Sequence, residues 1–197
     1  MEPSIRSFVA IDLSETTRRQ IGTLIQELRK SEAQVGWVRG EGIHLTLKFL
    51  GNVASGLIEE IKPALAREAA NTGPIRIEAA GCGAFPGIQS PRVIWVGLRG
   101  EIAPLADLAR RLEEALVAFG FAPETRPFKP HLTVGRVKGR ARLQALQQML
   151  LAHSGFSAEP FDAAQIVLYK SDLRPDGARY TPIFTTPFSV HPAPADE

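Results

Sequence analysis

Hydrophobic and polar positions along the first third of the chain follow two periods, one typical of strands and one of helices. An apolar run centred on 8–11 predicts a strand over 5–13. Apolar residues recur on one stripe from 14 to 30, and Ser14 is a suitable N-cap, which predicts a helix. Strands are expected at 37–38 and 43–50. The helical pattern of 55–71 contains Pro63, which should kink that helix or begin a shorter one.

The remaining pattern predicts strands at 75–84 and 92–97, joined by a loop around Pro86 and Gly87. A long amphipathic helix should follow over 102–119, then a strand at 131–137 and a helix at 142–152. Strands at 161–169 and 180–190 complete the order. Hairpin-like and crossover connections are mixed, so we expect an α+β fold with antiparallel-rich sheets. No linker is visible, and we expect a single domain over 1–190 with a flexible Pro- and Ala-rich tail at 191–197.

One four-residue pattern occurs twice in predicted strands. His44-Leu45-Thr46-Leu47 returns 87 positions later as His131-Leu132-Thr133-Val134. Side chains alternate between the two faces of a strand, so each histidine shares a face with its threonine while the apolar pair points to the core. Two similar half-domains that face each other would bring both polar faces into one cleft.

Continued alternation makes predictions for the flanking residues. It places Lys48 on the His44 face, Lys129 on the His131 face and Phe49 in the core with the leucines. Arg136 has the wrong parity relative to His131, so it reaches the cleft only if the strand bends near Gly135.

The two repeated motifs indicate acid–base chemistry on a phosphate. Two imidazoles that titrate near neutrality can act as general base and general acid, while hydroxyls and cations bind the phosphate oxygens. No carboxylate or cysteine stands at ligand spacing from either histidine, and no glycine-rich phosphate loop is present. We therefore expect neither a metal nor a cofactor.

Composition narrows the class further. The 197 residues include four histidines and one cysteine, Cys82, and a single cysteine excludes a disulfide framework. The net charge of +2 excludes a polybasic surface of the kind that coats nucleic acid. His153 and His191 lie in no motif. The N-terminus lacks the features of a signal peptide and no apolar segment is long enough to span a bilayer, so we expect a cytoplasmic protein with no membrane partner. We also expect a monomer.

These motifs resemble those of the 2H phosphoesterase superfamily. The segments 6–11, 48–51, 127–130 and 168–173 are similar to the RNA 2′,3′-cyclic phosphodiesterases, also called the 2′-5′ RNA ligase or LigT-like family. The resemblance implies a bilobal, pseudo-symmetric domain with two sheets around a central cleft. It also implies that RNA 2′,3′-cyclic phosphate ends are opened to 2′-phosphates without metal or cofactor, and that tRNA halves can be joined in reverse.

The resemblance assigns roles that the residues alone leave interchangeable. His44 would be the proton donor to the leaving 3′ oxygen, His131 the acceptor that activates water, and Thr46 and Thr133 would hold phosphate oxygens. We expect further substrate contacts from the residues beside the motifs: Arg136, Lys48, Lys129, Phe8 and Phe128. Arg126 and Tyr180 are weaker candidates, and Cys82 is expected to be buried.

Two other functions stay open at this stage. The same chemistry would serve a different small cyclic phosphate, such as an ADP-ribose cyclic phosphate, whereas small cyclic nucleotides are expected partners of the predicted phosphodiesterase itself. Alternatively, the cleft would bind an RNA end without turning it over, although a binding module has no need of a matched acid and base.

Overall fold

The computed structural model describes residues 3–174 and 177–189. In the first half of the chain the elements are β1 (Ser4–Ile11), α1 (Glu15–Arg29), β2 (Val35–Trp37), the 3₁₀ turn η1 (Gly40–Gly42), β3 (Leu45–Ala54), α2 (Ser55–Ala70) and β4 (Ile75–Phe85). In the second half they are β5 (Val93–Gly100), α3 (Ile102–Val117), β6 (His131–Val137), α4 (Leu143–Ala152), β7 (Phe161–Ala163), β8 (Gln165–Arg174) and β9 (Gly177–Pro187).

The strands form one antiparallel sheet with two halves. Its order is β7-β4-β5-β6-β3-β1-β8-β9, with β2 paired to β6. The halves meet where β3 pairs with β6, and the register there consists of one residue pair, Leu45 with Leu132. Each half therefore places its repeated motif on the strand at the junction. The two sheets expected from the resemblance are continuous because these two leucines join them.

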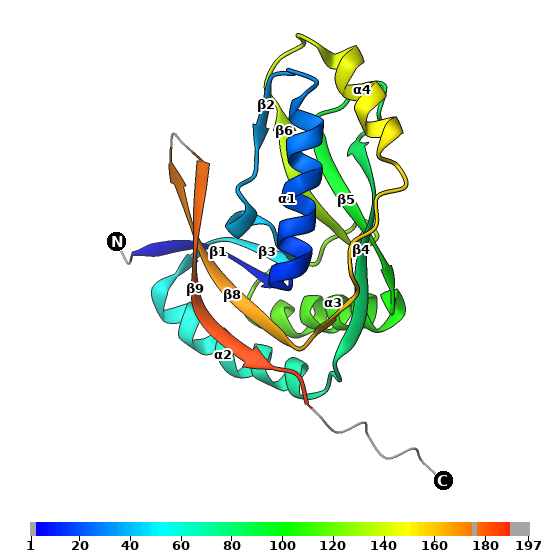
Figure 1. The fold of residues 1–197 in the computed structure, drawn as a ribbon. Helices are drawn as coiled ribbons and strands as arrows, with labels where there is room; N and C mark the ends of the chain where they lie inside the picture. Colours follow the sequence, from blue (N-terminus) through cyan, green and yellow to red (C-terminus); the bar gives the residue numbers. More distant parts are fainter. Residues whose placement is uncertain (1–2, 175–176, 190–197) are drawn as a thin grey trace.

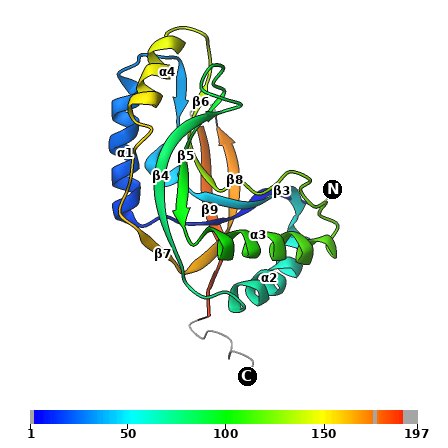
Figure 2. The ribbon, with the colours of Figure 1, turned by 90° about the vertical axis from the view of Figure 1, so that its right-hand side faces the viewer.

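Helices cover each half of the sheet on its outer side. Helices α2 and α3 pack on each other and contact β9 and β3, while α1 and α4 pack together beside β4 (Figures 1 and 2). Ser14 caps α1 as predicted and accepts a hydrogen bond from the Thr17 N–H, and the predicted stripe of α1 is buried. Among the described residues, one cluster of buried hydrophobic side chains spans both halves.

The α+β class is confirmed, and the differences from prediction are local. Helix α2 runs through Pro63 without ending. The segment 161–169 divides into β7 and the start of β8 at Ala164. The predicted tail at 191–197, which contains His191, lies outside the described residues. Within the described part of the chain, no helix is long and apolar enough to cross a membrane.

Candidate active site

The junction of the two half-sheets places the repeated motifs side by side. Leu45 and Leu132 are fully buried, so the face they share is the core face. When the antiparallel register is continued by one residue each way, His44 lies across from Thr133 and Thr46 lies across from His131. Alternation then puts all four polar side chains on the opposite face. Two imidazoles and two hydroxyls thus share one small area, with His44 preceding β3 and His131 beginning β6.

Each motif strand carries a β-bulge at its fourth motif position. The pairing of β1 with β3 shifts between Val9 and Ala10, which leaves Leu47 as the extra residue. The pairing of β5 with β6 shifts between Ile94 and Trp95, which leaves Val134 as the extra residue. An unpaired residue reverses the alternation beyond it. The residue five positions after each histidine therefore returns to the face of that histidine.

This reversal corrects the prediction for Lys48. The bulge turns Lys48 to the side of α3, where only 6% of its side chain is exposed and its Nζ pairs with the carboxylate of Glu113. Nζ also donates to the carbonyl of Ala122 at 2.7 Å, and Glu113 accepts from the backbone N–H of Glu124 at 3.1 Å. Lys48 thus holds the segment that leads to the second motif, and its Nζ lies on the side of α3 and not on the face of the motif histidines.

The same reversal brings Phe49 and Arg136 to the cleft face. Phe49, which alternation places in the core, is 65% exposed, and its ring centroid lies 5.9 Å from that of Phe8. Arg136 is exposed and its charge acts on the Tyr180 hydroxyl, so the strand irregularity that its role requires is present. Phe49 follows His44 by five positions and Arg136 follows His131 by five.

Aromatic rings enclose His44. The Phe8 ring stacks on the imidazole at 4.5 Å and on the Tyr169 ring at 5.3 Å, and the Tyr180 ring meets the imidazole edge-on at 5.0 Å. Phe8 is only 3% exposed. It therefore packs against His44 and leaves almost no exposed surface for the substrate contact predicted from the sequence.

This enclosure determines the protonation of His44. Burial disfavours the imidazolium and lowers the pKa of His44 to about 4, although the nearby Asp12 carboxylate and a hydrogen bond with the Gly42 backbone act in the opposite direction. The charge of Arg18 lowers the pKa further. In the substrate-free protein His44 is therefore neutral at pH 7.

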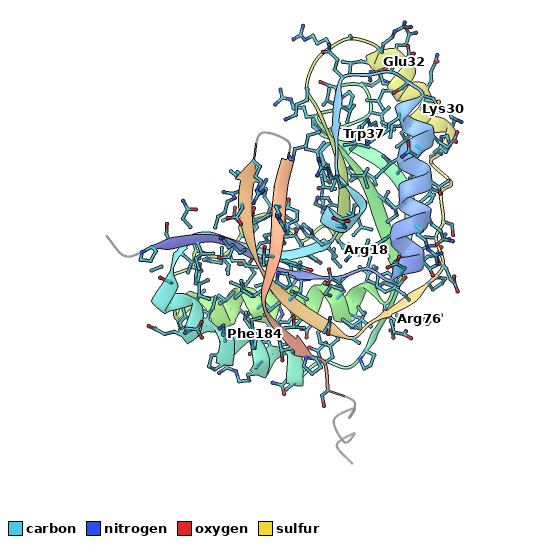
Figure 3. The ribbon with its side chains drawn as sticks, turned by 60° about the vertical axis from the view of Figure 1, so that its left-hand side comes forward. Arg18, Lys30, Glu32, Trp37, Arg76 and Phe184 are labelled. Atoms are coloured by element: carbon cyan, nitrogen blue, oxygen red, sulfur yellow. The ribbon has the colours of Figure 1, made fainter. Side chains whose placement is uncertain are left out.

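A polar network lies behind His44, and the sequence analysis did not predict it. The Tyr169 hydroxyl donates to the Asp12 carboxylate, with distances of 2.8 and 2.9 Å to its two oxygens, and Arg18 pairs with Asp12 at 2.9 Å. Arg18 extends from α1 toward η1 and also donates to the carbonyls of Gly40 and Ile43 (Figure 3). Burial and Asp12 raise the pKa of Tyr169. The network fixes η1, which precedes His44, relative to β1 and β8.

His131 has a simpler environment. Its Nδ1 lies 2.7 Å from the carbonyl of Lys129, and an edge-on contact with the Phe85 ring has a centroid distance of 5.0 Å. Donation from Nδ1–H to this carbonyl leaves Nε2 to face the cleft. Both histidines are thus oriented by the backbone two residues earlier, at Gly42 and Lys129.

The remaining predicted residues are divided between the cleft and the outer side. The Lys129 side chain is exposed, and its carbonyl holds His131. Phe128 packs against the core and, with Leu47, lines a depression of about 460 Å³ between α3 and the segment 122–128. This depression lies on the Lys48 side of β3, so Phe128 does not join the rings around His44. Arg126 is exposed and pairs with Glu124.

Few charges compete with a substrate at the cleft. Within 3–174 and 177–189, neither Arg6 nor Arg136 has a carboxylate within ion-pair distance, whereas Asp12 is held by Arg18 and Tyr169. In the same residues, no three His, Cys, Asp or Glu side chains gather in a group that could hold a metal ion. Cys82 is buried as predicted, and burial raises its pKa to about 11.

Solved structures share this architecture. A protein of Thermus thermophilus superimposes with a TM-score of 0.77 at 25% identity, over 95% of this chain and all of the other. LigT of E. coli in its apo form gives a TM-score of 0.73 at 25% identity, over 96% of this chain and 99% of LigT. The fold is therefore that of the LigT-like phosphoesterases.

Sequence comparisons give the family. A model of the 2′-5′ RNA ligase superfamily matches residues 17–175. The RNA 2′,3′-cyclic phosphodiesterase of Methanothermobacter thermautotrophicus is 34% identical over 177 residues, which are 90% of this chain and 95% of the relative. The enzyme of the same name from Aeropyrum pernix is 35% identical, over 86% of this chain and 95% of the relative. The chain belongs to the 2′-5′ RNA ligase superfamily, which confirms the resemblance inferred from the two motifs.

Proposed function

We propose that the protein is an RNA 2′,3′-cyclic phosphodiesterase whose two motif histidines act as general acid and general base. The observation that carries the proposal is the pairing of Leu45 with Leu132, which sets two imidazoles and two hydroxyls on one face of adjacent strands. Relatives of that name, matched over about nine tenths of this chain, support the choice of substrate. We further propose that it acts as a cytoplasmic monomer.

The reaction needs one proton taken and one proton given. His131 accepts a proton from water, whose oxygen attacks the cyclic phosphorus, and Thr46 and Thr133 hold the non-bridging oxygens. The bond from phosphorus to the 3′ oxygen breaks, His44 protonates that oxygen, and a 2′-phosphate remains. When a 5′-hydroxyl of a second RNA, such as a tRNA half, takes the place of water, the same bond to the 3′ oxygen breaks and a 2′-5′ linkage forms. The roles of donor and acceptor follow the resemblance to the family.

His44 can donate only if it gains a proton with the substrate. Its pKa of about 4 leaves it neutral at pH 7, but a phosphate anion beside the imidazole favours the charged form. We therefore expect a nucleoside 2′-phosphate to bind with net proton uptake near pH 6 to 7, and His44→Gln to abolish that uptake. Calorimetry in two buffers with different ionisation enthalpies measures it. Equal enthalpies in the two buffers would contradict the role of His44 as proton donor.

The proposal is tested by turnover of nucleoside 2′,3′-cyclic phosphates in excess chelator. His44→Ala and His131→Ala should each lower kcat by about 10²- to 10⁴-fold, the range expected for loss of a general acid or base. His153→Ala is the matched control, because His153 contacts the Met149 carbonyl at the end of α4, away from both motifs. Wild-type activity in both motif variants would exclude this function.

A further inference from the structure

The turn that precedes His44 is built from residues that give it little stiffness of its own. The turn η1 begins and ends with glycine, the residue whose backbone is least restricted. A Cβ at Gly42 would lie 3.1 Å from the Val38 side chain and 3.5 Å from the Tyr180 ring, so close packing requires glycine there. A hydrogen bond between the His44 ring and the Gly42 backbone favours the charged imidazole, so the ring donates it and the Gly42 carbonyl accepts it.

Arg18 holds this turn from α1. Its Nη1 donates to the carbonyls of Gly40 at 3.1 Å, Glu41 at 3.4 Å and Ile43 at 3.0 Å (Figure 3). These carbonyls lie on both sides of Gly42 in the chain. One guanidinium therefore fixes the backbone from which the acceptor of the His44 hydrogen bond projects.

The guanidinium of Arg18 is itself held in place. Its Nε donates to the carbonyl of Leu13 at 3.3 Å, and its Nη2 pairs with Asp12 at 2.9 Å. The Tyr169 hydroxyl binds the same carboxylate from β8, and only 20% of the Arg18 side chain is exposed. Because the donors of a guanidinium form a rigid planar fork, Arg18 links the end of β1 to η1 in one geometry.

The second motif reaches the same result without a side-chain clamp. The carbonyl that orients His131 belongs to Lys129, in a segment with Pro127 at one end and Pro130 at the other. Proline fixes the backbone angle φ, so this segment is stiff by itself. Arg18 supplies to the glycine turn of the first motif the rigidity that prolines supply to the second.

We propose that Arg18 is a positioning residue for His44: it clamps η1 so that the Gly42 carbonyl holds the imidazole with its other ring nitrogen toward the leaving oxygen of the substrate. The inference rests on the proposed function, because it takes His44 as a proton donor. A proton donor works only in the right geometry, and a displacement of about 1 Å can lower a rate by about 10²-fold.

Kinetics with a matched arginine test the clamp. Arg18→Gln should lower kcat for adenosine 2′,3′-cyclic phosphate by about 10- to 100-fold and leave KM within about twofold. The control is Arg111→Gln. Arg111 is also 20% exposed and binds a backbone carbonyl and the carboxylate of Glu68, but it lies between α2 and α3. Its kcat should stay within about twofold of the wild type, and equal losses in the two variants overturn the proposal.

A double-mutant cycle shows whether Arg18 acts through His44. In the His44→Ala background, Arg18→Gln should change the residual kcat by less than about twofold, because the group that it positions is gone. The same fold-loss in both backgrounds overturns the positioning role.

Arg18→Lys separates the clamp from the charge. Lysine keeps a cation beside Asp12, but a single ammonium cannot reach the Leu13 carbonyl and the carbonyls of η1 together. Its kcat should therefore stay within about threefold of that of Arg18→Gln. Wild-type kcat in Arg18→Lys overturns the clamp.

Nuclear magnetic resonance tests the position of the ring without turnover. At pH 7 the wild type and Arg111→Gln should show a His44 ring N–H signal that is protected from exchange by its hydrogen bond, and Arg18→Gln should lose it. If the wild type hydrolyses no cyclic phosphate but the signal depends on Arg18, the proposed function fails and the positioning stands. If hydrolysis depends on His44 but the signal is the same in all three proteins, the positioning fails alone.

Discussion

Protonation of His44 should destabilise the folded protein by an amount that follows from its enclosure. Burial against Phe8, Tyr169 and Tyr180 lowers the pKa of His44 from 6.5 to about 4. The unfolded chain therefore binds this proton more tightly, and the free energy of unfolding falls as the pH falls from about 6.5 to about 4. At about 1.36 kcal/mol per pKa unit, the full loss is on the order of 3 kcal/mol, and about 2 kcal/mol is lost at pH 5.

The difference between wild type and His44→Gln isolates this effect, because other titrating groups cancel. Urea unfolding at pH 7.5, 6, 5 and 4.5 gives the free energy of unfolding of each protein. The stability of the wild type relative to His44→Gln should be constant above pH 7 and should fall by about 2 kcal/mol by pH 5. A difference that does not change with pH would falsify the buried, neutral His44.

Three other substitutions test the supports of the site by urea unfolding at pH 7. Lys48→Met leaves the Glu113 carboxylate without its buried partner and should lower the free energy of unfolding by about 3–5 kcal/mol. The control Lys30→Met breaks an exposed pair with Glu27 and should lower it by less than about 1 kcal/mol. Equal losses in the two variants would contradict the buried pair. Tyr169→Phe removes the hydroxyl that donates to Asp12 and should cost about 1–2 kcal/mol, and no loss would mean that the hydrogen bond is unimportant. Leu132→Ala empties a fully buried position at the junction and should cost about 2–5 kcal/mol, and a cost below about 1 kcal/mol would contradict close packing there.

Periodicity predicted the elements well because most of them bury one regular stripe. The stripe on α1 and the strand at 131–137 follow the expected pattern, and both repeated motifs keep their apolar residues on the core face. The central feature of the site was therefore predictable from the sequence. Both motifs occupy strands, and their polar faces meet.

The wrong faces predicted for Lys48 and Phe49 share one physical cause. A bulge at Leu47 and another at Val134 reverse the alternation of side chains, so Lys48 turned to α3 while Phe49 and Arg136 turned to the cleft. The extra residue of neither bulge is a glycine, so the sequence does not mark these positions. A prediction from strict alternation assumes that every residue of the strand is paired.

The sequence also could not predict which distant residues interact with each other. Asp12 and Tyr169 are 157 positions apart, and only the pairing of β1 with β8 brings them together behind His44. The Lys48–Glu113 pair joins β3 to α3 across 65 positions. Such contacts depend on strand order, which local periodicity does not determine.

The most direct test is the identity of the phosphate left after turnover. The wild type, incubated with adenosine 2′,3′-cyclic phosphate in excess chelator, should yield adenosine 2′-phosphate, with turnover reduced by about 10²- to 10⁴-fold in both His44→Ala and His131→Ala. A 3′-phosphate product would contradict the assignment of the 3′ oxygen as the leaving group. Full turnover without both histidines would contradict a site in which two imidazoles act on opposite sides of one phosphorus.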